Sequence, residues 1–208
     1  MTIKSNRNTI LIIALLIIAI AIITKISPAE KTLGDLVKTI YIHAALIWAS
    51  IIMFSAAGLL GLGFCFSGKD SLYQWSSATE YIAISIWSIN FLFSLVLMSL
   101  IWGGIAWNEP RTLMSLTILI FSIVLIFARL ITASAKVKGF YNFLMSVILW
   151  FELVRTNVVI HPAGAISAST STAIKIYTII ISLLVFMVTI LLAAFVRNKL
   201  VPVKIKTE

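Results

Sequence analysis

The sequence predicts an all-α integral membrane protein, a bundle of about six transmembrane helices that forms one domain over residues 1–208. Hydrophobic residues make up 61% of the chain, charged residues only 11%, and the mean hydropathy is +1.11. A soluble domain needs far more polar residues to cover its surface. The length suits about six spans of roughly 20 residues with short connections. The third observation is that basic residues stand at the ends of the apolar runs.

The first expected span covers residues 9–25 and follows Lys4 and Arg7. A cleaved signal peptide is the alternative, with small residues near Ser27 to Ala29 as the cleavage site. The apolar run is long for a signal peptide, and Lys25 precedes the small residues. We therefore expect the span to be retained as a membrane anchor.

Five further apolar runs follow, each bounded by polar residues. In hydrocarbon only a helix satisfies the backbone groups of a single segment of this length, so each run is expected to be helical. A polar loop that contains Asn108 and Arg111 separates the third span from the fourth, and His161-Pro162 ends the fifth. The expected spans are 40–66, 81–102, 113–135, 140–160 and 173–196.

Lysine and arginine positions predict the orientation, because cytoplasmic ends of spans carry the excess of these residues. With the N-terminus inside, nine fall on the cytoplasmic side and five on the outer side. Both termini are then cytoplasmic, in a multi-pass protein of the cell membrane. The basic residues form no continuous face, which argues against nucleic-acid binding. The cytoplasmic set is Lys4, Arg7, Lys69, Lys136, Lys138, Arg197, Lys199, Lys204 and Lys206; the outer set is Lys25, Lys31, Lys38, Arg111 and Lys175.

Several classes of protein are excluded by what the sequence lacks. The single cysteine, Cys65, allows neither an internal disulfide nor a Cys-x-x-Cys motif. The chain is therefore neither a thiol oxidoreductase nor a c-type cytochrome. Nucleophile-elbow, phosphate-loop and zinc-type spacings are missing, and the carboxylates are few and scattered. We expect no catalytic residues, and a binding or handling protein rather than an enzyme.

The two histidines of the chain are predicted to reach the same membrane surface. His43 stands at the outer end of the second span and His161 at the outer end of the fifth. Neutral imidazole is a common ligand of haem iron, and two histidines from different helices can occupy both axial positions. The alternative is that each histidine lies singly at the headgroup level. Both readings remain open on spacing alone.

Other residues can supply the walls and the cations of a haem site, although some of them also have another plausible role. Aromatic walls can come from Trp48, Trp102 and Trp107, and cations for the propionates from Lys38, Arg111 and Arg155. Tryptophans at span ends are also common interfacial anchors, and for Trp75, Trp87 and Trp150 we expect either this role or plain packing.

Four polar or charged residues stand out within the spans. Glu152 and Arg155 are three residues apart and can pair on one helix face, as a structural lock or as part of a pocket. Asn90 is expected to bond to another helix. Arg129 is expected to extend toward the cytoplasmic headgroups.

A familiar pattern surrounds the first histidine. The segment V-K-T-I-Y-I-H-A-A-L-I-W, Val37 to Trp48, resembles a segment of the haem-handling proteins of cytochrome c maturation, and most of all the haem exporter protein C type. The resemblance implies that His43 is one axial ligand of haem b. It assigns the second ligand to His161, which ends V-V-I-H. The stretch 102–111 is similar to the tryptophan-rich loop that holds haem at the outer surface in that family, with Trp102, Trp107 and Arg111 at matching positions.

The resemblance covers about residues 35–200 and includes departures. The loop retains only two tryptophans, and Asn108 stands where the family has aspartate. The implied function is to hold haem at the outer surface and to pass it on for attachment to apocytochrome c. A haem chaperone and transporter subunits are the implied membrane partners. The alternatives are a haem-free structural or permease-like subunit of a larger complex, and a bis-histidine haem subunit that oxidises quinol.

Overall fold

Six long helices make up most of the part of the chain that the structure describes. A computed structural model describes residues 3–156, 166 and 169–200. Each helix is long and apolar enough to cross a membrane, so the prediction of an all-helical, multi-pass membrane protein is confirmed. In the described residues the only β-type pairing is an isolated bridge between Glu30 and Gly34. The helices are α1 (Ile3–Ile26), α2 (Val37–Ser67), α3 (Asp70–Trp102), α4 (Pro110–Ile131), α5 (Ala135–Arg155) and α6 (Thr172–Arg197).

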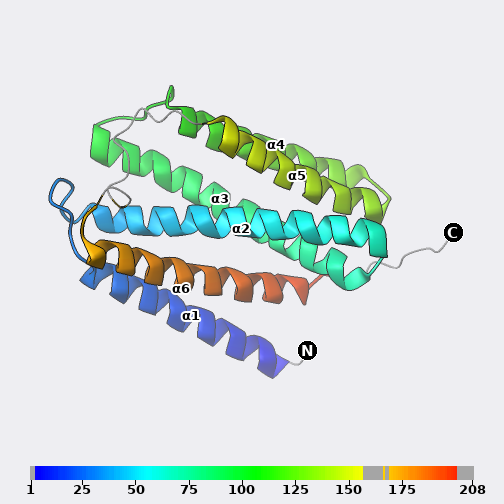
Figure 1. The fold of residues 1–208 in the computed structure, drawn as a ribbon. Coiled ribbons are helices and arrows are strands. Elements are labelled where there is room, and N and C mark those ends of the chain that lie inside the picture. Colours follow the sequence, from blue (N-terminus) through cyan, green and yellow to red (C-terminus); the bar gives the residue numbers. More distant parts are fainter. Residues whose placement is uncertain (1–2, 157–165, 167–168, 201–208) are drawn as a thin grey trace.

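The helices run alternately up and down (Figure 1). One end of the bundle, on the left in Figure 1, contains the starts of α2, α4 and α6 and the ends of α1, α3 and α5. We call this the His43 end, and we call the opposite end the Lys69 end. α2 is central and packs on α3, α5 and α6, whereas α1 packs mainly along α6 at the edge.

α3 begins at Asp70, although the expected span began near Tyr81. The added turns are polar, and yet Ser76, Ser77 and Glu80 are buried. Sequence hydropathy misses such a segment because it counts these side chains as polar. Within the bundle they face other helices, so the helix extends past the apolar run.

The polar first turns of α3 take part in a hydrogen-bond network around a buried arginine. Arg129 of α4 donates from Nη1 to Asn142 Oδ1 at 2.8 Å and from Nη2 to Ser77 Oγ at 2.9 Å. Asn142 in turn donates to Ser76 Oγ at 2.8 Å. The expectation that Arg129 extends to the headgroups is therefore wrong. The network joins α3, α4 and α5 because a buried guanidinium needs several acceptors to offset its desolvation.

Small residues bring α2 and α5 into close contact near the Lys69 end. A Cβ on Gly61 would collide with the carbonyl oxygen of Gly139, and a Cβ on Gly58 would collide with the Ser146 side chain. Small residues at such positions let membrane helices approach closely. Toward the His43 end, α4 and α5 diverge from α2 (Figure 1).

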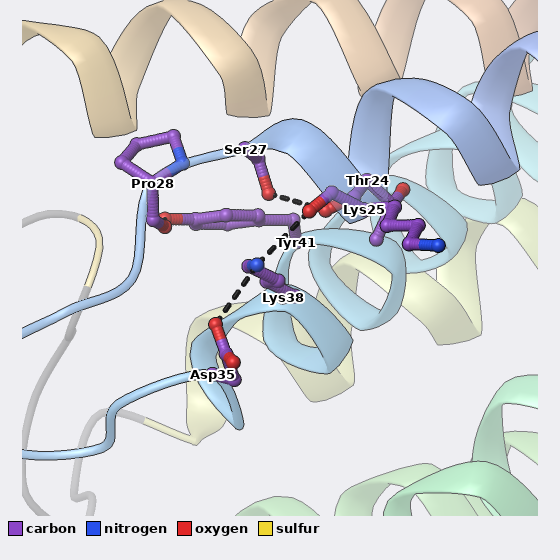
Figure 2. Close-up of polar contacts among 7 residues, drawn as sticks. All are labelled: Thr24, Lys25, Ser27, Pro28, Asp35, Lys38 and Tyr41. Atoms are coloured by element: carbon purple, nitrogen blue, oxygen red, sulfur yellow. Dashed lines mark hydrogen bonds and ion pairs between the residues drawn. The ribbon is translucent and has the colours of Figure 1, made fainter.

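The loop between α1 and α2 is fastened to the first turns of α2 (Figure 2). The Tyr41 hydroxyl donates to the carbonyl oxygen of Pro28 at 2.9 Å. Lys38 donates to the carbonyl oxygen of Lys25 at 2.9 Å and pairs with Asp35 at 2.8 Å. These contacts hold the segment of α2 that carries His43.

Candidate functional site: a cavity at the His43 end

Where α4 and α5 diverge from α2, near the His43 end, they leave a cavity of about 1190 Å³. Its walls come from α2 to α6 and from the loops before α2, α4 and α6. Ligand pockets typically measure about 300–1,000 Å³, so the space suits a large ligand. Just over half of the lining residues are apolar, and serine, threonine and charged residues make up most of the rest.

His43 lies on the second turn of α2 and lines this cavity. Its ring is partly buried and tilted by 55° against the Phe93 ring of α3, with 6.5 Å between the centroids. Tyr41, two residues earlier, is fully buried and fixed to Pro28. Because Tyr41 is anchored, the helix face that carries His43 is held toward α3.

Asn90 of α3 contributes a polar side chain to the cavity wall, about three turns from the end of the helix. Its side chain is only 5% exposed, and Oδ1 has no hydrogen-bond partner in the described part of the chain. The expected bond to another helix is therefore not seen at this oxygen. A buried carbonyl oxygen without a partner is unfavourable, so a donor from a ligand or water would stabilise it.

Trp87 lies one turn from Asn90 on the same helix and is 3% exposed. Its Nε1 donates to the carbonyl oxygen of Ser115 at 3.0 Å, which ties α3 to α4 beside the cavity. Trp150 similarly donates to Ser55 Oγ at 3.0 Å and ties α5 to α2. Both indoles combine packing with an interhelical hydrogen bond.

The turn between α3 and α4 lines the cavity at the His43 end, and we call this turn, together with Glu30, the mouth of the cavity. Gly103 ends α3 with φ at +74°, a conformation that glycine adopts without steric cost, and Pro110 starts α4. Trp102 and Arg111 flank this turn, and both are exposed and line the cavity. Glu109 also lines the cavity and is 3% exposed.

Glu30, in the loop before α2, adds a negative charge to the mouth. Its carboxylate accepts hydrogen bonds from the backbone N–H groups of Leu33 and Thr32 at 2.9 and 2.7 Å. These N–H groups, that of Leu33 most strongly, hold the pKa of Glu30 below its usual value. The mouth therefore carries both an anion and the Arg111 cation.

The cavity gathers only some of the residues that the sequence singled out. His43, Trp48, Trp102 and Arg111 line it. Trp107 is 53% exposed and is not among the described lining residues. His161 lies outside the residues that the structure describes.

The other two predicted cations have partners away from the cavity. Lys38 pairs with Asp35, and Arg155 Nη2 pairs with Glu152 Oε2 at 2.7 Å. The predicted Glu152–Arg155 pair is thus confirmed. Neither of its members is among the described lining residues, so the pair acts within α5 rather than in the cavity.

Together, the six apolar helices and the cavity define a multi-pass α-helical membrane protein with a large, mainly apolar cavity near one end of the bundle. No protein-family model matches the chain, and no curated protein matches it significantly. Its function must therefore be argued from its own residues.

Proposed function

We propose that this protein holds haem b in the cavity at the His43 end, and that it passes the haem on for attachment to apocytochrome c. The observation that carries the proposal is the gathering of His43, Trp102 and Arg111 around one large, mainly apolar cavity. Haem needs this combination: a ligand for iron, apolar and aromatic walls for the macrocycle, and a cation for the propionates.

Each of these residues has a defined task in the proposal. His43 supplies one axial ligand, and His161 supplies the other through the resemblance of V-V-I-H to the family motif. Trp48 and Trp102 cover the macrocycle, and Arg111 at the mouth pairs with a propionate. The bound haem supplies the iron and porphyrin chemistry, while the protein binds and orients it.

The proposed orientation places the His43 end on the extracytoplasmic side of the cell membrane. It rests on the excess of lysine and arginine at the Lys69 end. Haem would leave through the mouth formed by Trp102 and Arg111, toward a haem chaperone or transporter subunit of cytochrome c maturation. Trp107, exposed beside this mouth, is available to such a partner.

Absorption spectroscopy of the purified protein tests the proposal. Wild-type protein reconstituted with haem should show a Soret band with a defined stoichiometry. His43→Ala and the double variant His43→Ala/His161→Ala should lose or shift that band because iron loses its imidazole ligands. Thr39→Ala is the matched control: Thr39 lies one turn earlier on α2, and its hydroxyl donates only to the carbonyl oxygen of Leu36.

Three results would reject or redirect the proposal. An unchanged Soret band in the double variant would exclude histidine ligation. Absence of any band in the wild-type protein would favour a haem-free subunit of a larger complex. Fast reduction of bound haem by quinol would instead favour a quinol-oxidising subunit.

A further inference from the structure

One side of the cavity is lined by α2, α5 and α6. α5 and α6 both pack along α2, but within the described residues no Cα atom of α5 lies within 8 Å of a Cα atom of α6. Three side chains between them line the cavity and are nevertheless largely exposed: Trp48 by 60%, Trp150 by 49% and Leu183 by 58%. We call this opening between α5 and α6 the side window. Ile179, which is 58% exposed, completes its α6 edge.

The side window lies at the depth of the hydrocarbon. Trp48 is eleven residues after the start of α2 at Val37, and Leu183 is eleven residues after the start of α6 at Thr172. At 1.5 Å per residue each lies roughly 16 Å from its helix start, close to the middle of a core that is about 30 Å thick. The window therefore faces acyl chains rather than water.

The chemistry of the cavity changes from the window to the mouth. The window is bounded by indole and aliphatic side chains, whereas Glu30, Glu109 and Arg111 lie at the mouth. The unpartnered Asn90 oxygen provides a hydrogen-bond acceptor in the interior. This arrangement matches an amphiphile whose apolar body lies near the window and whose charged group lies at the mouth.

We infer that the cavity takes up its ligand sideways, from the membrane leaflet at the His43 end and through the side window. The inference rests on the proposed function in taking haem as the ligand. Haem dissolved in the leaflet would keep its macrocycle in apolar surroundings along the whole route. Its propionates would stay at the headgroup level, because burying them unpaired is costly.

Two adjacent residues of α6 allow a matched test. Ile179 lines the cavity at the window, whereas its neighbour Ile180 is not among the described lining residues and lies at almost the same depth. Ile179→Trp narrows the window, and Ile180→Trp adds the same side chain on another face. Each variant is reconstituted in phosphatidylcholine vesicles, haem is added to the lipid, and the Soret shift is followed in time.

Ile179→Trp should take up haem about tenfold more slowly than wild type, which corresponds to about 1.4 kcal/mol in the entry barrier. The uptake rate of each variant is normalised to its own final Soret amplitude, and Ile180→Trp should match wild type in both rate and amplitude. Equal rates for the two variants would overturn the inference. A slowed rate in Arg111→Gln, with a normal rate in Ile179→Trp, would place entry at the mouth and overturn it as well.

A second probe separates failure of the route from failure of haem binding. If wild-type protein gives no Soret shift, the proposed function fails, and the same vesicles are loaded with anthroyloxy-stearic acid, an amphiphile that accepts energy from tryptophan. Slower transfer in Ile179→Trp than in Ile180→Trp would then still support the window, and equal rates would reject it. Leu183→Phe, with Leu184→Phe as its control, replaces the tryptophan pair if either variant is not folded.

Discussion

At the scale of single residues, two buried asparagines have opposite surroundings. Asn142 accepts from Arg129 and donates to Ser76, so it belongs to a hydrogen-bond network. Asn90 is as deeply buried, but its Oδ1 faces a cavity without a partner in the described residues. A buried polar group that lacks a partner destabilises the empty protein. A ligand that donates a hydrogen bond to Oδ1 would explain why an asparagine stands at this position.

This contrast yields a paired prediction. Asn90→Leu should leave thermal stability unchanged or raise it, because no bond of Oδ1 is lost, while it weakens haem binding in the cavity. Asn142→Leu should lower stability by about 1–3 kcal/mol, because the Arg129 guanidinium loses an acceptor. Thermal unfolding in detergent measures the first effect, and haem titration measures the second. Equal destabilisation by both substitutions would show that Asn90 has a structural role.

At the scale of elements, the cavity depends on how α5 crosses α2. Gly58, Gly61 and Gly139 permit backbone contact near the Lys69 end. Toward the His43 end, bulky side chains such as Ile47 and Trp48 of α2 line the cavity instead. The α4–α5 pair is thus held at one end and diverges at the other (Figure 1). Close packing at the Lys69 end therefore stabilises the bundle, while the divergence at the His43 end leaves space for a ligand.

Two glycines of α2 test this account. Gly61→Ala should destabilise the protein by about 1–3 kcal/mol, since its Cβ meets the backbone of Gly139 and the neighbouring helix must shift. Gly63→Ala should be neutral or stabilising by up to about 1 kcal/mol, because alanine favours the helix and its Cβ meets only Leu72 Cδ1 at an ordinary 3.5 Å. Chemical or thermal unfolding in detergent measures both variants. Similar stability of the two would contradict close α2–α5 packing.

At the scale of the whole molecule, six antiparallel spans put all the cavity-lining helix ends on one side. The proposed orientation puts that side at the exterior, because the Lys69 end carries more lysine and arginine. The polar mouth and the side window then belong to the same outer half of the membrane. A haem carrier that serves an extracytoplasmic acceptor requires this arrangement.

Labelling of intact cells checks this orientation. In a Cys65→Ser background, Asn108→Cys lies in the exposed α3–α4 turn, and Ala133→Cys lies in the exposed α4–α5 turn at the other end. A membrane-impermeant maleimide should label the first variant from outside and the second only after lysis. The reverse pattern would place the cavity mouth in the cytoplasm and would remove the proposed delivery route.

The class of fold was accessible from the sequence because it follows from composition and solvent. Long apolar runs must be helical in hydrocarbon, where no water satisfies the backbone. The close spacing of Glu152 and Arg155 likewise predicted their pair, because neighbours three residues apart on a helix share a face. The resemblance around His43 pointed to a region that does line the cavity.

The buried face of each span was not accessible in this way, and only the tertiary structure decided it. Lipid is as apolar as leucine, so a helix that is hydrophobic all round does not reveal which side meets protein and which meets the bilayer. For that reason the sequence alone left Arg129 at the headgroups and paired Asn90 with a helix, whereas the packing of α2 to α5 buries the first in a network and turns the second toward a cavity. The local chemistry of the chain determined a six-helix membrane protein, and the way its helices cross determined where a ligand can be held.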